Sequence, residues 1–164
     1  MRVTRVFTVL AAVALVGVAC GDDSGTGIPS GVEIFTATLN GANEVPALPT
    51  PTTATGTATM TVLGNLLSWK VDAQDIENVS VGHIHLAVAG EPGGVIQDLT
   101  PTPGDYPTLT TIALGSLEVG DDILSAMRAG STYVNIHTSD AANPDNNVPG
   151  DYPGGEIRGQ LRKH

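Results

Sequence analysis

Cysteine is almost absent from this 164-residue chain, which contains only Cys20. A lone cysteine cannot form a disulfide within the chain, so no disulfide framework is expected. Basic residues are also scarce, since seven lysines and arginines stand against seventeen acidic residues, and no basic cluster offsets the excess. Such a surface repels nucleic acid and anionic lipid. We therefore exclude nucleic-acid binding.

Long apolar runs are also missing, except for one at the N-terminus. Residues 6–18 are mostly apolar, follow two arginines and precede small residues. This pattern is typical of a secretory signal peptide, and the run is too short for a stable membrane span. We predict a signal peptide over residues 1–19 and secretion across the inner membrane; a buried N-terminal helix is the alternative.

The single cysteine directly follows this segment. Residues 17–20 read GVAC, which resembles the lipobox of bacterial lipoproteins, although that pattern favours leucine where Gly17 stands. Acylation with two or three chains would anchor the protein stably. We therefore predict lipidation at Cys20, a flexible tether over residues 20–31, and a membrane-anchored lipoprotein of the bacterial cell envelope. Soluble secretion with an incidental cysteine is the alternative.

Removal of the predicted signal peptide also changes the net charge of the chain. Arg2 and Arg5 leave with the signal peptide, so the mature chain keeps five basic and seventeen acidic residues, a net charge of −12. This excess of acids keeps a domain soluble or attracts cations into its loops.

Residues 32–164 have the texture of a β domain. Short alternating runs rich in Thr, Val and Ile are separated by Gly, Pro, Asn and Asp. Three runs place an apolar triplet on one face: Phe35, Ala37 and Leu39; Ala58, Met60 and Val62; and Leu67, Trp69 and Val71. Further strands are predicted over residues 79–89, 108–114, 132–138 and 156–161, and one helix over residues 121–129. We predict an all-β domain, an antiparallel β-sandwich or flattened Greek-key barrel with one short helix.

Three of the four histidines fall within predicted strands. The period of two places them opposite apolar neighbours that claim the core, so the polar side chains are predicted to face outward onto one surface. This polar set comprises His83, His85, Asn135, His137, Glu156 and Arg158. Two imidazoles at i and i+2 of a strand, with a third from another strand, suit copper or zinc. We predict a metal site at His83, His85 and His137; solvated surface histidines are the alternative.

The order of these motifs resembles the CHRD (chordin-type) domain family. The motifs are F-x-A-x-L-x-G-x-x-E-V-P from Phe35 to Pro46, followed by GHIH, YVNIHT and GGEIRGQL. The resemblance spans residues 32–162 and implies an extracellular domain. In chordin, such domains are part of an extracellular antagonist of growth factors. Protein binding is therefore one function that the resemblance implies. Nothing here resembles chordin's cysteine-rich growth-factor-binding modules.

A more distant likeness is to copper/zinc superoxide dismutases, which are also β-sandwiches. Those enzymes carry an H-x-H copper pair, a later copper histidine and an arginine near the C-terminus that guides the anion. His83, His85, His137 and Arg158 fall in the same order. The bridging histidine, the zinc-ligand loop and the disulfide have no counterpart. The likeness implies a single-metal site, with Asn135, Glu156 and Arg158 around the metal or guiding an anion.

No catalytic residue is predicted. The chain lacks a G-x-S-x-G nucleophile elbow and a phosphate-binding loop. The main hypothesis is a non-enzymatic, lipid-anchored protein that binds copper or zinc. The alternatives are an envelope module that binds a protein or glycan without metal, and a redox enzyme of superoxide-dismutase type.

Three further sequence features each allow two interpretations. Arg158 either guides an anion or pairs with Glu156. Residues 139–155 contain aspartates that form a mobile loop or bind calcium, without the ordered spacing of a calcium loop. The segment PGDYP occurs at residues 103–107 and 149–153, as two similar turns or as two loops that contact a shared partner or cation.

Overall fold

The computed structural model describes residues 31–141 and 145–164. The predicted signal peptide, the lipidation site at Cys20 and all but the last residue of the predicted tether lie outside the described residues. Within the described part, no helix has the length and apolar character needed to cross a membrane.

The domain consists of strands and two short helices. In chain order they are β1 (Val32–Asn40), the 3-10 helix η1 (Gly41–Asn43), β2 (Thr55–Leu63), β3 (Leu66–Gln74), β4 (Ile76–Leu86), β5 (Gly94–Asp98), β6 (Gly104–Tyr106), β7 (Thr110–Glu118), α1 (Asp121–Arg128), β8 (Thr132–Thr138), β9 (Ile157–Gln160) and β10 (Arg162–Lys163). The prediction of an antiparallel β fold with one short α-helix is confirmed.

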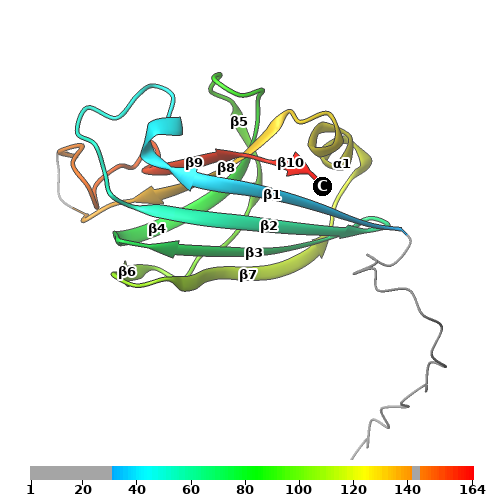
Figure 1. Ribbon diagram of the computed structural model, residues 1–164, viewed down its shortest axis with the longest axis horizontal. Coiled ribbons are helices and arrows are strands. Elements are labelled where there is room, and N and C mark those ends of the chain that lie inside the picture. The colour runs from blue at the N-terminus through cyan, green and yellow to red at the C-terminus, as the bar shows by residue number, and fades with distance from the viewer. Residues whose placement is uncertain (1–30, 142–144) are drawn as a thin grey trace, which may run out of the picture.

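All of these strands belong to one antiparallel sheet. Its order is β5-β4-β8-β9-β1-β2-β3-β7, with β10 added to β1 and β6 added to β4. The sheet curls strongly, so that β3 and β7 lie across the interior from β4 and β8 as in a half-barrel (Figure 1). Two faces therefore oppose each other across one core, although a single sheet supplies both.

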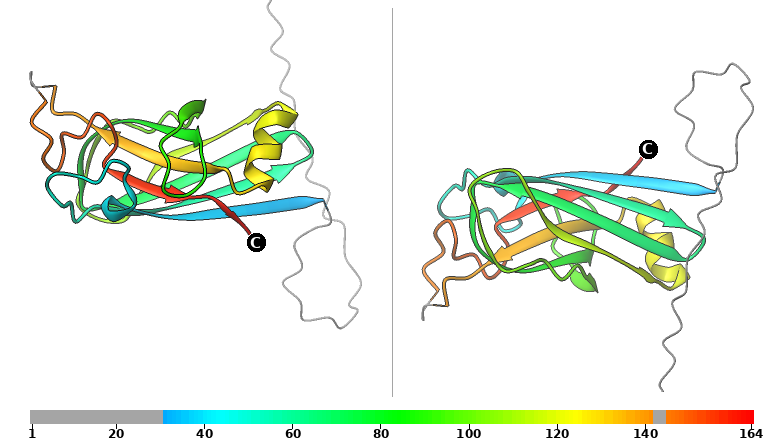
Figure 2. Two further views of the ribbon diagram at one scale, coloured as in Figure 1. Left: turned by 90° about the horizontal axis from the view of Figure 1, so that it is seen from above. Right: turned by 90° about the horizontal axis from the view of Figure 1, so that it is seen from below.

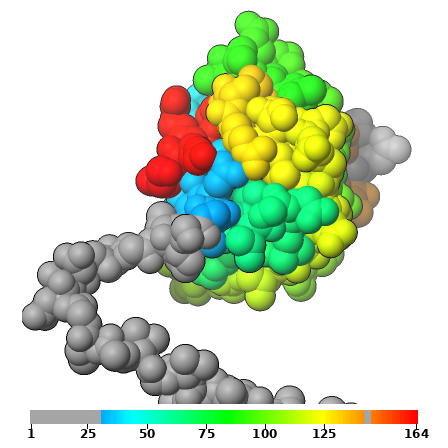
Figure 3. All heavy atoms as spheres, turned by 90° about the vertical axis from the view of Figure 1, so that its right-hand side faces the viewer, coloured from blue at the N-terminus to red at the C-terminus, as the bar shows by residue number. Residues whose placement is uncertain are grey.

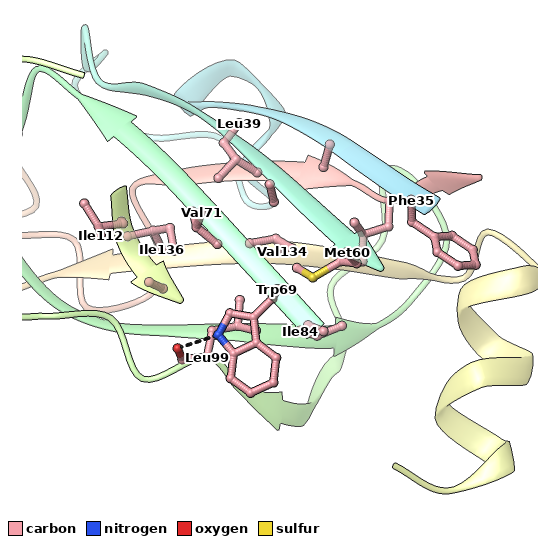
Figure 4. Packing of buried hydrophobic residues seen from close by; sticks show 14 of the residues in the cluster. Phe35, Leu39, Met60, Trp69, Val71, Ile84, Leu99, Ile112, Val134 and Ile136 are labelled. Carbon is pink, nitrogen blue, oxygen red and sulfur yellow. Dashed lines mark hydrogen bonds between the residues drawn. The ribbon is translucent and has the colours of Figure 1, made fainter. Parts of the chain in front are cut away.

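The core fills the inside of this curl. The three apolar triplets predicted from alternation in β1, β2 and β3 are all buried, which confirms their inward orientation. Trp69 packs among them, and its indole N–H donates a hydrogen bond to the carbonyl of Leu99 at 3.1 Å (Figure 4). Apolar burial on this scale is the main stabilising term of such a fold.

Helix α1 closes one end of the curl. Asp121 and Asp122 lie in its first turn, where carboxylates favour the helix dipole, and Gly130 follows its end with a φ of 68°. Leu124 and Met127 are buried against the core. Loops gather at the opposite end, as the two views in Figure 2 show.

One predicted burial in β4 is wrong. The alternation that places His83 and His85 outward puts both Ile84 and Leu86 on the core side, but Leu86 is 48% exposed whereas Ile84 is buried. The register between β4 and β5 shifts between Ile84 and His85, and β4 ends at Leu86 instead of continuing to Ala89. The extra residue, Ile96, lies on β5, whereas β4 keeps a regular register with β8 up to Leu86. Leu86 is therefore exposed as the last residue of β4, and the alternation of the strand itself is intact.

Candidate metal centre

The three predicted ligands come from two neighbouring strands. His83 and His85 lie on β4, and His137 lies on β8, which pairs with β4 in antiparallel register. They project from the sheet face opposite the core residue Ile84. One ligand nitrogen from each histidine lies within 4.8 Å of the others. The structure therefore brings the three together, as predicted.

The cluster is buried, which corrects the prediction that it lies on an open outer surface. His85 and His137 are each only 7% exposed, and His83 is half-buried. Two loops cover the site: residues 87–93, which join β4 to β5, and residues 145–156, which precede β9. Backbone carbonyls of these loops hydrogen-bond to the imidazole rings. The loops therefore bury this part of the outer face of the sheet.

These loop carbonyls fix the ring tautomers. His85 Nδ1 lies 2.9 Å from the carbonyl oxygen of Gly93, and His137 Nδ1 lies 2.9 Å from that of Pro153. A carbonyl oxygen only accepts hydrogen bonds, so each Nδ1 carries the proton and each Nε2 keeps a lone pair. Within the described residues, His85 Nε2 is buried without a hydrogen-bond partner. This arrangement is the usual preparation of a histidine for binding metal.

His83 completes the cluster through His137. Its Nδ1 lies 3.2 Å from His137 Nε2, and because that Nε2 bears the lone pair, His83 is the donor. A metal ion bound by three imidazoles at 2.0–2.1 Å would hold their nitrogens about 3.5 Å apart. The observed spacing within 4.8 Å therefore needs only small side-chain rotations to reach that geometry.

Burial also keeps two of the rings neutral. Desolvation, together with the neighbouring imidazoles of His83 and His85, lowers the pKa of His137 to about 4, although the hydrogen bond to Pro153 acts in the opposite direction. The pKa of His85 is lowered mainly by the same desolvation. Neutral imidazole is the form that binds metal, so these two ligands are ready at neutral pH.

Tyr133 connects the cluster to Arg158. The Tyr133 ring stacks on His85, with centroids 4.8 Å apart and an interplanar angle of 9°. Arg158 Cζ lies 3.5 Å from the centroid of the same ring. Two groups this close must occupy opposite faces of the phenol ring. Sequence reasoning missed Tyr133, although the period of two places it on the same strand face as Asn135.

Asn135 lies beside the cluster and contacts a buried acid. Its register partners are His83 on β4 and Arg158 on β9, and its Nδ2 donates to Glu44 Oε2 at 3.4 Å. Glu44 is 6% exposed, and burial raises its pKa to about 7, although the Arg158 charge acts in the opposite direction. Sequence reasoning gave Glu44 no role.

Glu156 makes its contacts away from the histidines. Its carboxylate accepts hydrogen bonds from Thr52 Oγ1 at 2.5 Å, Thr138 Oγ1 at 2.7 Å and the backbone N–H of Gly150 at 2.9 Å. Within the described residues it forms no ion pair with Arg158, whose Nη2 donates to the carbonyl of Glu91 at 2.7 Å. Glu156 thus fastens the loops at this end of the sheet.

The calcium alternative for residues 139–155 gains no support from the described part of that loop. Over the described ranges, the three histidines are the only close group of three or more metal-binding side chains. Asp151 is buried, and its Oδ2 accepts from the backbone N–H of Asn146 at 2.6 Å.

Comparison with known proteins identifies the domain. Residues 35–161 match the family description "CHRD domain". The chain belongs to the CHRD domain family. No curated protein and no solved structure matches the chain. The matched part of the CHRD domain runs from β1 to the end of β9 and includes all three histidines.

Proposed function

We propose that this CHRD domain binds one copper or zinc ion through His83, His85 and His137. One observation carries the proposal: two buried, neutral imidazoles are oriented by loop carbonyls through Nδ1, and each of the three rings brings a nitrogen within 4.8 Å of the others. Imidazole is a good ligand for copper and zinc, and a strand pair holds all three rings.

The hydrogen-bonding state of His85 favours a metal over a structural role. A buried polar atom without a partner costs about 1–3 kcal/mol, and His85 Nε2 is such an atom. A histidine that served only to hold the loop would use Nδ1 and leave Nε2 in contact with water. A bound ion would satisfy Nε2 where no described hydrogen-bond donor does.

The chemistry of the site follows from its ligand number. Three imidazoles leave a coordination position of copper or zinc open for water or another small ligand. We propose that the domain serves metal storage, sensing or protection.

Metal uptake by the purified chain tests this function. The wild-type chain should take up one zinc or copper ion, and His83→Ala and His85→Ala should each weaken that affinity by at least about 100-fold, because only two imidazoles remain. The matched control is His164→Ala, since His164 is the one histidine outside the cluster and bonds Thr36 Oγ1. Equal uptake by His85→Ala and His164→Ala would reject the site.

We also propose that the domain is held at the cell envelope by a lipid on Cys20. The support is the sequence alone: an apolar leader, a lipobox-like GVAC segment and a polar tether. Cys20→Ser should move the protein from the membrane fraction to the soluble fraction of the producing cells. A wild-type chain that is already soluble would reject the anchor.

A binding module for an envelope protein or glycan is the second candidate. Leu86, Val88 and Val95 are each about half exposed on the β4–β5 hairpin that carries the loop over the histidines. Exposed apolar side chains gathered on one hairpin are typical of a protein contact. This reading predicts no metal uptake above background, together with a crosslinked partner that Val88→Asp abolishes.

Redox chemistry of superoxide-dismutase type is the third candidate. Its support is the order of the histidines and Arg158 in the chain, together with the connection of Arg158 to His85 through Tyr133. Superoxide consumption by the copper-loaded protein, lost in His137→Ala, would support it. An inert copper-loaded protein would exclude it.

A further inference from the structure

A second site lies on the other side of Arg158 from the histidines. A cavity of about 520 Å³ is lined by β1, β9, β10 and Ala89–Gly90. Figure 3 shows the C-terminal residues, in red, beside the blue residues of β1. The polar lining includes Thr36 and Thr38 from β1 and Gln160 from β9. Such a volume is typical of a small-molecule site.

The charge of this lining is opposite to that of the chain. Residues 31–164 contain only five lysines and arginines, and three of them line the cavity: Arg158, Arg162 and Lys163. None of the lining side chains is acidic. Glu33 reaches Lys163 from outside the lining at 2.6 Å and partly offsets its charge, whereas Arg162 forms no ion pair within the described residues.

Arg158 supplies a buried cation to this cavity. It is only 3% exposed, yet among the described side chains no carboxylate lies within ion-pair distance of its guanidinium. Its contacts are the carbonyl of Glu91 and the ring of Tyr133, and the buried Glu44 carboxyl is near enough for the Arg158 charge to act on it. Buried arginines are normally matched by an anion, and the guanidinium has five N–H donors in a planar fork.

We propose that this cavity binds a small molecule that carries an oxyanion group and hydroxyl groups, such as a sugar phosphate. The Arg158 and Arg162 guanidinium groups would receive the oxyanion through charge-assisted hydrogen bonds. Thr36, Thr38 and Gln160 offer hydrogen-bonding groups suited to hydroxyls. The cavity is much larger than an inorganic phosphate ion, so the ligand extends beyond the charged group.

The inference does not depend on the metal centre, but the two sites are connected. Arg158 and His85 contact opposite faces of the Tyr133 ring. Binding of an oxyanion at Arg158 is therefore expected to change the environments of Tyr133 and His85. A diffuse attraction of anions to surface lysines would leave these buried rings unchanged.

Titration of the metal-free, full-length chain with glucose 6-phosphate tests the proposal. We expect saturable binding by calorimetry and shifts of the Tyr133 and His85 ring signals by NMR. Arg162→Gln should weaken the affinity about tenfold by removing a charge-assisted contact. Arg162 is exposed, so its replacement leaves the fold intact. The control is Lys70→Gln, which removes the same charge from a side chain that does not line the cavity and pairs with Asp72.

Several results would overturn the inference. One is the absence of saturable binding up to about 10 mM, which is weaker than a specific site would allow. Another is an equal loss of affinity in Lys70→Gln and Arg162→Gln. Binding to phosphatidylglycerol vesicles without binding of glucose 6-phosphate would reject a soluble ligand. Because metal is absent from this assay, its failure leaves the metal proposal untouched.

Discussion

At the scale of single residues, burial shifts His137 and Glu44 toward neutral forms and gives them opposite effects on stability. The pKa of His137 falls from 6.5 to about 4, so the unfolded chain binds the proton first and stability decreases as the pH falls through this range. The pKa of Glu44 rises from 4.5 to about 7, so the folded chain binds the proton first and stability decreases as the pH rises through that range.

Replacing Glu44 with Gln should remove the second effect. Above pH 7 the wild-type chain buries a carboxylate charge that the Glu44→Gln chain does not carry. The free energy of unfolding of Glu44→Gln, relative to wild type, should therefore increase by about 1–3 kcal/mol between pH 5 and pH 8. Urea unfolding at both pH values measures this difference, and a pH-independent difference would contradict the assignment.

The lowered pKa values of His137 and His85 also predict how the metal site responds to acid. Protons compete with metal for imidazole, and ordinary histidines lose metal as the pH falls through their pKa of 6.5. Zinc uptake should therefore persist at pH 6, as measured by equilibrium dialysis from pH 8 to pH 4. Loss of zinc already at pH 7 would contradict the effect of burial.

The side-chain identities of the site could be predicted from the sequence, whereas its environment could not. The period of two correctly placed His83, His85 and His137 on one side of the sheet. The burial of that side depends on loop carbonyls from Gly93 and Pro153. Backbone groups carry no residue-specific signal, so the sequence offered no means of finding them.

At the scale of elements, the loop of residues 87–93 holds the site together. Arg158 binds the carbonyl of Glu91, Gln160 binds that of Ala87 at 3.0 Å, and His85 binds that of Gly93. Tyr133 Oη accepts a hydrogen bond from the backbone N–H of Gly93 at 3.1 Å. The side chains of three strands therefore fix one loop over the metal ligands.

Gly93 is the tightest point of this loop. A Cβ atom at this position would lie 2.0 Å from the carbonyl oxygen of Leu86, so Gly93→Ala must displace the loop. Its carbonyl would no longer orient His85, and zinc affinity should decrease by about 10–100-fold with all three ligands intact. Chelator competition measures this change.

The neighbouring Gly94 provides the control. A Cβ atom there meets nothing within 4 Å, so Gly94→Ala should bind zinc like wild type. Unchanged affinity in Gly93→Ala would show that the loop does not orient the ligand.

Strands with regular alternation were predictable, including the four-residue β9. β6 and β10 have three and two residues, too few for a period to show, and β5 was also missed. The two PGDYP segments illustrate the difficulty: the first contributes β6, and the second lies in a loop. Both contact Asn78, which donates its backbone N–H to Asp105 at 2.8 Å and its Nδ2 to the carbonyl of Gly150 at 3.1 Å.

At the scale of the whole molecule, one curled sheet has a dry inner face and a partly covered outer face. Ile84 lies on the inner face of β4, between the two histidines of the outer face. Removing its side chain leaves a cavity, so Ile84→Ala should lower the free energy of unfolding by about 2–5 kcal/mol. Denaturant unfolding measures this loss.

Leu114 provides the comparison on the outside of the molecule. It is 75% exposed, so Leu114→Ala should change the free energy of unfolding by less than about 0.5 kcal/mol. Equal effects of the two substitutions would contradict the inner and outer faces described for the sheet.

The fold class was predictable because apolar alternation is a local property. The joining of every strand into a single sheet was not, because the pairing of β9 with β1 and of β8 with β4 links segments far apart in the chain. Long-range register of this kind leaves no local signature in the sequence.

Diffraction from crystals of the zinc-loaded protein, recorded at the zinc absorption edge, tests the metal centre most directly. The account predicts one anomalous peak, about 2.0–2.1 Å from a nitrogen of each of His83, His85 and His137. A zinc-saturated crystal with no peak among these three rings would contradict it.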